Sequence, residues 1–287
     1  RLSTLPFLGH QDRIWLVYQM LRAALQMEEL GVGHGDIKLD TFVVTTANWL
    51  FLTDFVACKP VALPEDNPID FSIFFNTSGT RTTCIAPERF TKEGDPAAPT
   101  QLTPQMDIFS LGCTIAELCL DGQPVFDLAQ LLDFRREGGG VPAPVRKIAE
   151  PALRRLVESM LALDPAQRHS AAEYLRDWTP ELFPEWIEDI WLFCGQLVAK
   201  SADERVQIMA DNFDAVVERL KNPNSTAARR FKLALRQHYG MPTDQLEEEL
   251  AQELQKEQEQ QEQQQQQEEE EEEEEERQKQ GASSDDD

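Results

Sequence analysis

Apolar residues recur at helical spacing along most of the first 240 positions of the chain. Between residues 12 and 30 the apolar positions Ile14, Tyr18, Leu21 and Leu25 lie three or four residues apart, and Gly31 follows as a stop signal. This spacing is typical of an amphipathic helix. Similar patterns predict four more helices, over residues 105–120, 128–136, 152–163 and 171–177. The first of these four is apolar on nearly every face, so we expect it to be buried.

The segments between the helices contain one predicted hairpin and one long loop. Two short runs rich in β-forming residues, 42–45 and 49–53, flank a polar turn, which predicts a β-hairpin. A polar loop over residues 34–41 precedes this hairpin. Residues 56–104 are rich in proline and show little periodicity. We expect a loop there, and loops of such length are usually functional or disordered.

The chain divides into three parts. Residues 1–180 form the first domain, and a helical extension follows over residues 181–240, in which Ser201 and Glu204 have the spacing of a capping box. Residues 241–287 are rich in Gln and Glu and include nine consecutive Glu at 268–276. Because the tail has no apolar residues to bury after Leu254, we expect it to be disordered.

Composition excludes some classes of function. The chain has 27 basic and 52 acidic residues among 287, for a formal net charge of −25, and residues 246–287 hold 19 of the acidic residues against 3 basic ones. Binding to nucleic acid is not expected, because it depends on basic patches. The five cysteines show no CxxC spacing and are expected to be free thiols in a reducing compartment. The most apolar late run, residues 190–199, is too short to span a membrane.

Several short motifs occur in an order that carries more information than any one of them alone. His34-Gly35-Asp36-Ile37-Lys38 lies in the polar loop, and Asp54-Phe55-Val56 follows Asp36 by eighteen residues, at the end of the predicted hairpin. Ala86-Pro87-Glu88 ends the long loop, Asp107 begins the buried helix, and Asp164 to Arg168 precede the helix over residues 171–177. Taken singly, Asp36 and Asp54 would be ordinary turn residues.

Together these motifs resemble the C-terminal lobe of a eukaryotic protein kinase, a mainly α-helical lobe with a short β-hairpin. The resemblance implies binding of ATP and Mg²⁺ and transfer of phosphate to serine or threonine. It makes Asp36 the candidate catalytic base and places Lys38 beside the transferred phosphate. It makes Asp54 a magnesium ligand, with Thr41 as a second and weak one. It gives structural roles to His34, Phe55, Asp107, and Glu88 with Arg168, which would form a buried ion pair.

A closer resemblance lies in the long loop, at Leu63-Pro-Glu-Asp-Asn-Pro68, Asp70-Phe71, Phe74-Phe75, Thr77-Ser78 and Ile85 to Phe90. These residues are similar to the kinase-like regulatory subunits of the class III phosphatidylinositol 3-kinase complex, which act in autophagy and vacuolar protein sorting. The resemblance implies that residues 181–240 begin a series of HEAT-like helical repeats. It also implies the lipid kinase catalytic subunit and the other subunits of its autophagic and endosomal complexes as partners. The expected location is the cytoplasmic face of endosomes, vacuoles and autophagosome-forming membranes, reached through the complex or through a lipid anchor at a missing N-terminus.

Departures from an ordinary kinase leave two other interpretations open. Gly35 replaces the arginine that reads a phosphorylated activation loop, Val56 replaces a glycine, and Thr41 replaces the usual asparagine. No glycine-rich loop or Val-Ala-Ile-Lys strand precedes the first helix, so we expect a fragment that lacks the nucleotide lobe and is inactive alone. The alternatives are a catalytically inactive scaffold that restrains the lipid kinase, and an unrelated serine/threonine kinase fragment.

Overall fold

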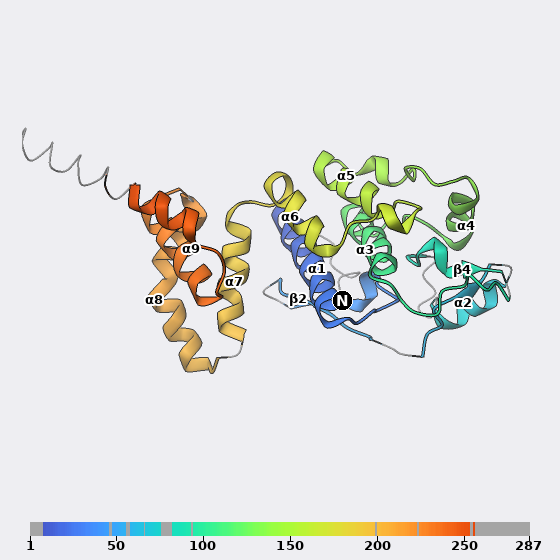
Figure 1. The fold of residues 1–287 in the computed structure, drawn as a ribbon, viewed down its shortest axis with the longest axis horizontal. Coiled ribbons are helices and arrows are strands. Elements are labelled where there is room, and N and C mark those ends of the chain that lie inside the picture. The colour runs from blue at the N-terminus through green and yellow to red at the C-terminus, as the bar shows by residue number, and fades with distance from the viewer. Residues whose placement is uncertain are drawn as a thin grey trace, which may run out of the picture. The chain divides into compact units, whose positions relative to one another are not determined.

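The structure is a computed structural model that describes residues 8–45, 48–55, 58–65, 67–75, 82–92, 94–198, 200–222, 224–252 and 255. The chain forms two compact units, residues 1–184 and residues 185–287 (Figure 1). Each unit is described by itself. Among the described residues, no helix combines the length and the apolar character needed to cross a membrane. Val56, Thr77, Ser78 and the Glu run 268–276, which carried expectations above, lie outside the described residues.

The first unit is mainly helical. Its α-helices are α1 (His10–Leu30), α2 (Pro68–Phe74), α3 (Pro104–Cys119), α4 (Leu128–Arg136), α5 (Pro151–Met160) and α6 (Ala171–Leu182). Its 3₁₀ turns are η2 (Leu39–Thr41), η3 (Pro87–Arg89), η4 (Val145–Lys147) and η5 (Pro165–Gln167). Its strands are β1 (Phe42–Val44), β2 (Leu50–Leu52), β3 (Leu63–Pro64) and β4 (Phe90–Thr91). The expected kinase-lobe class, helical with a short hairpin, therefore describes this unit.

Helix α3 lies at the centre of the first unit. Every residue from Met106 to Leu118 is buried, as the uniformly apolar sequence predicted. Helices α1 and α5 pack against it, and α6 packs along α1 (Figure 1). A Cβ atom at Gly112 would lie 2.8 Å from Cβ of Met160, so glycine is what allows α3 and α5 to approach this closely.

The predicted hairpin is present, and helix α1 holds it in place. Strands β1 and β2 pair in antiparallel fashion, with Phe42 opposite Leu52. Gln19, buried on α1, donates through Nε2 to the carbonyl oxygen of Asn48 at 2.8 Å. Its Oε1 accepts the backbone N–H of Leu50 at 2.8 Å. Asn48 in the turn of the hairpin and Leu50 at the start of β2 are therefore fixed relative to α1.

The long loop expected over residues 56–104 is more ordered than the sequence predicted. It contains helix α2, whose N-cap residue Asn67 accepts the backbone N–H of Ile69 at 3.1 Å. It also contains β3, which pairs with β4 in parallel fashion. Both elements were missed because seven and two residues are too few to produce a recognisable period. Phe71 and Phe75 are buried within this unit and belong to its core.

The described part of the second unit includes α7 (Trp186–Val198), α8 (Ala202–Lys221) and α9 (Thr226–His238). Its core is formed by Phe193, Phe231 and Leu235. The capping box predicted at Ser201 is formed with Glu204.

One expectation about the tail is wrong in part. Residues 244–252, inside the segment expected to be disordered from residue 241, are helical, and Leu250 is buried. A few apolar residues before Leu254 are enough to hold this turn of helix. The remainder of the acidic tail lies outside the described residues except for residue 255.

Candidate active site

The loop over residues 34–38 is anchored by one buried carboxylate. Helix α1 ends at Gly31, whose φ of 65° turns the chain out of the helix. The two oxygens of Asp107 then accept the backbone N–H groups of His34 at 2.8 Å and of Gly35 at 2.7 Å. Burial raises the pKa of Asp107, although these two N–H groups act in the opposite direction. The role that the resemblance implied for Asp107, holding the loop in place, corresponds to this geometry.

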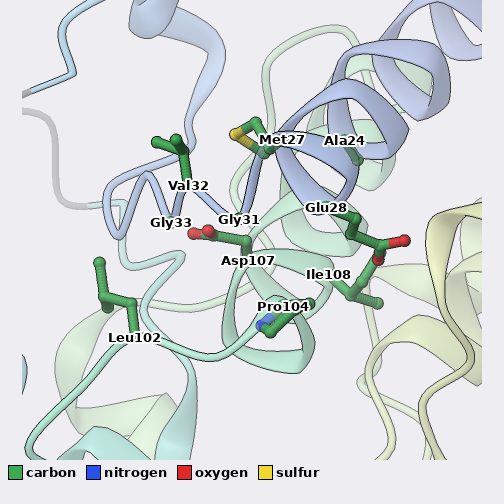
Figure 2. A pocket seen from close by; sticks show the side chains of 10 residues that line it. All are labelled: Ala24, Met27, Glu28, Gly31, Val32, Gly33, Leu102, Pro104, Asp107 and Ile108. Carbon is green, nitrogen blue, oxygen red and sulfur yellow. The ribbon is translucent and has the colours of Figure 1, made fainter.

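Asp107 also lines a small cavity. Its volume is about 120 Å³, and its lining includes Met27, Val32 and Leu102. Figure 2 shows the carboxylate of Asp107 pointing toward the chain at Gly33. The cavity includes neither Asp36 nor Asp54, so it is not the place where the proposed chemistry would occur.

Asp36 is buried and is held by two lysines. Nζ of Lys38 lies 3.0 Å from Oδ2 of Asp36, which places the two catalytic candidates together. Nζ of Lys38 also donates to the carbonyl oxygen of Phe75 at 3.2 Å. The second lysine, Lys59, donates to the same oxygen of Asp36 and was not anticipated. It lies in the irregular segment after the hairpin, where no periodicity points toward Asp36.

His34 joins the loop to the end of the hairpin. Its Nδ1 accepts the backbone N–H of Asp36 at 3.2 Å, and Nε2 lies 2.8 Å from the carbonyl oxygen of Thr53. With Nδ1 accepting, Nε2 carries the proton and donates to that carbonyl. Phe55 packs edge-on against the His34 ring, with ring centroids 4.7 Å apart. His34 and Phe55 are thus in contact.

The two proposed magnesium ligands differ in how well they fit a metal ion. Asp54 is exposed and adopts a φ of 66°, and its carboxylate is the hard oxygen ligand that magnesium prefers. Such a backbone conformation in a residue other than glycine is often associated with function. Thr41 is buried, and its hydroxyl already donates to the Lys38 carbonyl at 2.9 Å and accepts the Lys38 N–H at 3.2 Å. Thr41 therefore closes the loop, and it does not fit the metal.

The residues present supply an incomplete metal site. In the described part of the chain, no group of three or more His, Cys, Asp and Glu side chains is placed to hold a metal ion. Of the two proposed ligands, only Asp54 fits the magnesium that the resemblance to protein kinases implies, and the phosphates of a nucleotide would supply further oxygens. Bound magnesium would neutralise charge on those phosphates.

The ion pair expected between the end of the long loop and the helical core is formed. Arg168, whose side chain is fully buried, donates through Nη1 to Oε1 of Glu88 at 2.7 Å and through Nη2 to Oε2 at 3.0 Å. The same guanidinium donates to three backbone carbonyls, those of Gln105, Ala162 and Leu163. All five N–H groups of Arg168 are used, so the pair fixes η3, α3 and the segment before η5 to one another.

Comparison with known proteins agrees with this geometry. The family described as the protein kinase domain matches residues 5–179. A probable serine/threonine-protein kinase vps15 from Dictyostelium discoideum is 45% identical over 230 residues, covering 79% of this chain. Serine/threonine-protein kinases named VPS15 from Arabidopsis thaliana and Schizosaccharomyces pombe are 44% and 37% identical, covering 65% and 78% of this chain. The chain spans only 12% to 14% of the length of these three relatives.

Proposed function

This chain belongs to the protein kinase family and is similar to the serine/threonine kinases named VPS15, and from that premise we propose that it acts within a kinase-like regulatory subunit of class III phosphatidylinositol 3-kinase. The subunit would serve autophagy and protein sorting at endosomes and vacuoles. Its partners would be the lipid kinase catalytic subunit and the other subunits of that complex. Membrane association would come through the complex or a lipid anchor.

The observation that carries the catalytic part of the proposal is the pairing of Asp36 with Lys38. The carboxylate of Asp36 is buried and 3.0 Å from Nζ of Lys38, on a loop whose backbone is fixed by Asp107. A carboxylate in this position can accept the proton of a serine or threonine hydroxyl, while the lysine stabilises charge on the transferred phosphate. ATP and magnesium are the expected cofactors.

A phosphotransfer assay on the full-length protein tests this part. Asp36→Asn keeps the size of the side chain and removes the base, so phosphate transfer should fall by about 10²-fold or more. Asp133→Asn is the matched control, because Asp133 lies on α4 and pairs with Arg136 at the surface. Transfer that is equal in both variants would show that Asp36 is not the base.

Activity of residues 1–287 alone is expected to be negligible. Within this chain the candidate ligands for nucleotide and metal reduce to Asp54, since the hydroxyl of Thr41 is engaged with Lys38. Catalysis of phosphoryl transfer depends mainly on positioning and metal charge. Calorimetric titration of this chain with ATP and magnesium should give no tight binding, and micromolar affinity would contradict the expectation.

A second candidate function is an inactive scaffold for the lipid kinase. The observation that favours it is Lys59, whose ammonium group pairs, as that of Lys38 does, with Oδ2 of Asp36, the carboxylate that would have to accept the proton of a substrate hydroxyl. For a scaffold, Asp36→Asn would leave recovery of the lipid kinase and its activity unchanged, and no phosphate transfer would be measured in the parent protein.

The proposed contact with the lipid kinase is assigned to helix α2. Phe75 is buried within its own unit, whereas Ile69 and Ile73, one turn apart on α2, are 63% and 60% exposed. A protein partner that covered this exposed apolar pair would remove it from water. Recovery of the lipid kinase in a pull-down should drop with Ile69→Asp and Ile73→Asp. The control is Leu30→Asp, at the end of α1, where the residue is 76% exposed. Unchanged recovery would exclude α2 as the contact.

A further inference from the structure

Arg89 is a buried arginine that binds the backbone of two loops. It follows Glu88 in η3 and is 1% exposed. Its Nε donates to the carbonyl oxygen of Val61 and its Nη2 to that of Pro60, both at 2.8 Å. Its Nη1 donates to the carbonyl oxygen of Gly35. One guanidinium therefore joins the loop of Asp36 to the segment that follows the hairpin.

The charge of Arg89 is not neutralised by a direct partner. Within the described residues its hydrogen bonds go to carbonyl oxygens and it forms no ion pair; its guanidinium lies over the Phe75 ring, 5.2 Å from the centroid. Burial lowers the pKa of Arg89, while the more distant charges of Asp107 and Asp36 raise it. Burying an unpaired cation is expensive unless its donors are satisfied, and here each of the three guanidinium nitrogens donates to a backbone carbonyl.

The backbone at Gly35 explains why the guanidinium comes from position 89. Gly35 has a φ of 75°, and a Cβ atom there would lie 2.7 Å from Cδ1 of Leu102. A side chain at position 35 is therefore disfavoured by backbone conformation and by space. The N–H of Gly35 donates to Asp107 at 2.7 Å, and the carbonyl oxygen of Gly35 accepts a hydrogen bond from Arg89. Because that carbonyl belongs to the peptide that leads into Asp36, Arg89 helps to orient the candidate base.

We propose that Arg89 is a positioning residue that holds residues 58–63 against the loop of Asp36 without any phosphate. In kinases activated by phosphorylation, an arginine at the position of Gly35 binds the phosphate and so orders the loop. Here Arg89, in η3, supplies the guanidinium, and it binds backbone carbonyls directly. Residues 58–63 are thus held by contacts within the folded unit and need no phosphate. The inference about catalysis rests on the proposed function, whereas the inference about loop order does not.

The same contact fixes Lys59. This lysine precedes Pro60, whose carbonyl Arg89 binds, and its ammonium group pairs with Asp36. Arg89 and Lys59 also share the Phe75 ring, at 5.2 and 5.6 Å from its centroid. Loss of Arg89 should therefore release Lys59 from Asp36 as well as loosening the backbone.

Amide hydrogen exchange of the full-length protein tests the proposal. The variants are Arg89→Met, which removes the donors, and Arg89→Lys, whose single ammonium cannot reproduce the planar fork. The control is Arg176→Met, since Arg176 is exposed and pairs with its neighbour Asp177. A further sample is the parent protein treated with a phosphatase. Phosphate transfer is measured as kcat and KM for ATP, corrected for the folded fraction from thermal unfolding.

Each sample has its own expected exchange rate. Peptides covering residues 58–65 should exchange about tenfold faster or more in Arg89→Met, because three hydrogen bonds from a charged donor are lost. Arg89→Lys should be intermediate, and Arg176→Met and the phosphatase-treated parent should match the untreated parent. In an active protein, kcat should fall while KM for ATP stays constant.

Two results would overturn the proposal. One is exchange in Arg89→Met that rises equally across the whole first unit, which would mark Arg89 as an ordinary core residue. The other is faster exchange of residues 58–65 after phosphatase treatment of the parent, which needs no variant to fold. If the parent transfers no phosphate, the proposed catalytic function fails, but the exchange experiment still decides the role of Arg89.

Discussion

Replacing Arg168 with methionine should remove a large part of the stability of the first unit. The guanidinium is fully buried, makes two bonds to Glu88 and three to backbone carbonyls, and lies over the Phe109 ring, 4.9 Å from the centroid. Methionine fills a similar volume but supplies no donor. The variant therefore leaves a carboxylate and three carbonyl oxygens without the partner that satisfied them.

The expected size of the effect follows from those contacts. Breaking a buried ion pair by removing one partner typically costs about 3 to 5 kcal/mol. The Glu88 side chain is 22% exposed, so water can reach it and the carboxylate contributes toward the lower end of that range. The three carbonyl oxygens lose a donor in the same substitution, and because these losses are not additive they move the expected total only from the lower end of that range to its middle. We expect a loss of about 4 kcal/mol, a large fraction of a typical stability of about 5 to 15 kcal/mol. Arg168→Lys should lose about half as much, because it keeps the charge but not the two parallel bonds.

Amide exchange of α3 is the measurement, because this buried helix exchanges only when the first unit opens. The control is Arg155→Met, which breaks an ion pair with Glu181 between side chains that are 48% and 53% exposed. That change should alter the free energy of unfolding by less than about 1 kcal/mol. If Arg168→Met were destabilised no more than the control, the buried pair would not be what ties the end of the long loop to the core.

Three other predictions concern the first unit. Burial raises the pKa of Glu117 from 4.5 to about 7, so the folded state holds an extra proton between these values and the free energy of unfolding falls as the pH rises through them. Glu117→Gln should therefore raise that free energy above about pH 7, by at most about 3 kcal/mol, and change it little below about pH 4, in urea titrations at both pH values. Iodoacetamide followed by mass spectrometry should label exposed Cys58 well before Cys119, whose thiol pKa burial raises to about 12. Gly112→Ala should lower the midpoint of thermal unfolding, at a cost of about 1 to 3 kcal/mol, because its Cβ would lie 2.8 Å from Cβ of Met160; an unchanged midpoint would contradict that close approach.

The long helices and the hairpin could be predicted because their signals are local. Helix α4 begins and ends at the predicted residues, and α1 and α3 agree within two residues at each end. In the helices the apolar residues repeat at helical spacing over several turns, and helix-ending residues such as Gly31 mark the boundaries. Helix α2 lacked such a repeat, since the buried Phe71 and the buried C-cap residue Phe75 are a single turn apart.

The site residues that belong to recognisable motifs could be predicted from the sequence. The assignments of Asp36, Asp107 and Arg168 came from the resemblance that their motifs carry, and the structure brings Asp107 and the loop together. Lys59 and Arg89 could not be assigned, because their contacts depend on how an irregular segment folds back over the loop. One signal was available for Arg89, which follows Glu88 as a second charged residue in the otherwise apolar run from Cys84 to Phe90. A charge in such a run needs buried partners.

The conformation of Gly35 has an evolutionary consequence. An arginine introduced at this position would have to adopt a φ near 75°, at a cost of roughly 1 to 2 kcal/mol, and would displace the end of the Leu102 side chain. It would also arrive beside a carbonyl that Arg89 already binds. The effect of a mutation at position 35 thus depends on the residues at positions 89 and 102, which is epistasis with a visible structural cause. We therefore expect that arginine at position 35 alone does not make this loop switchable by phosphate, and that the change would also need compensating substitutions at positions 89 and 102.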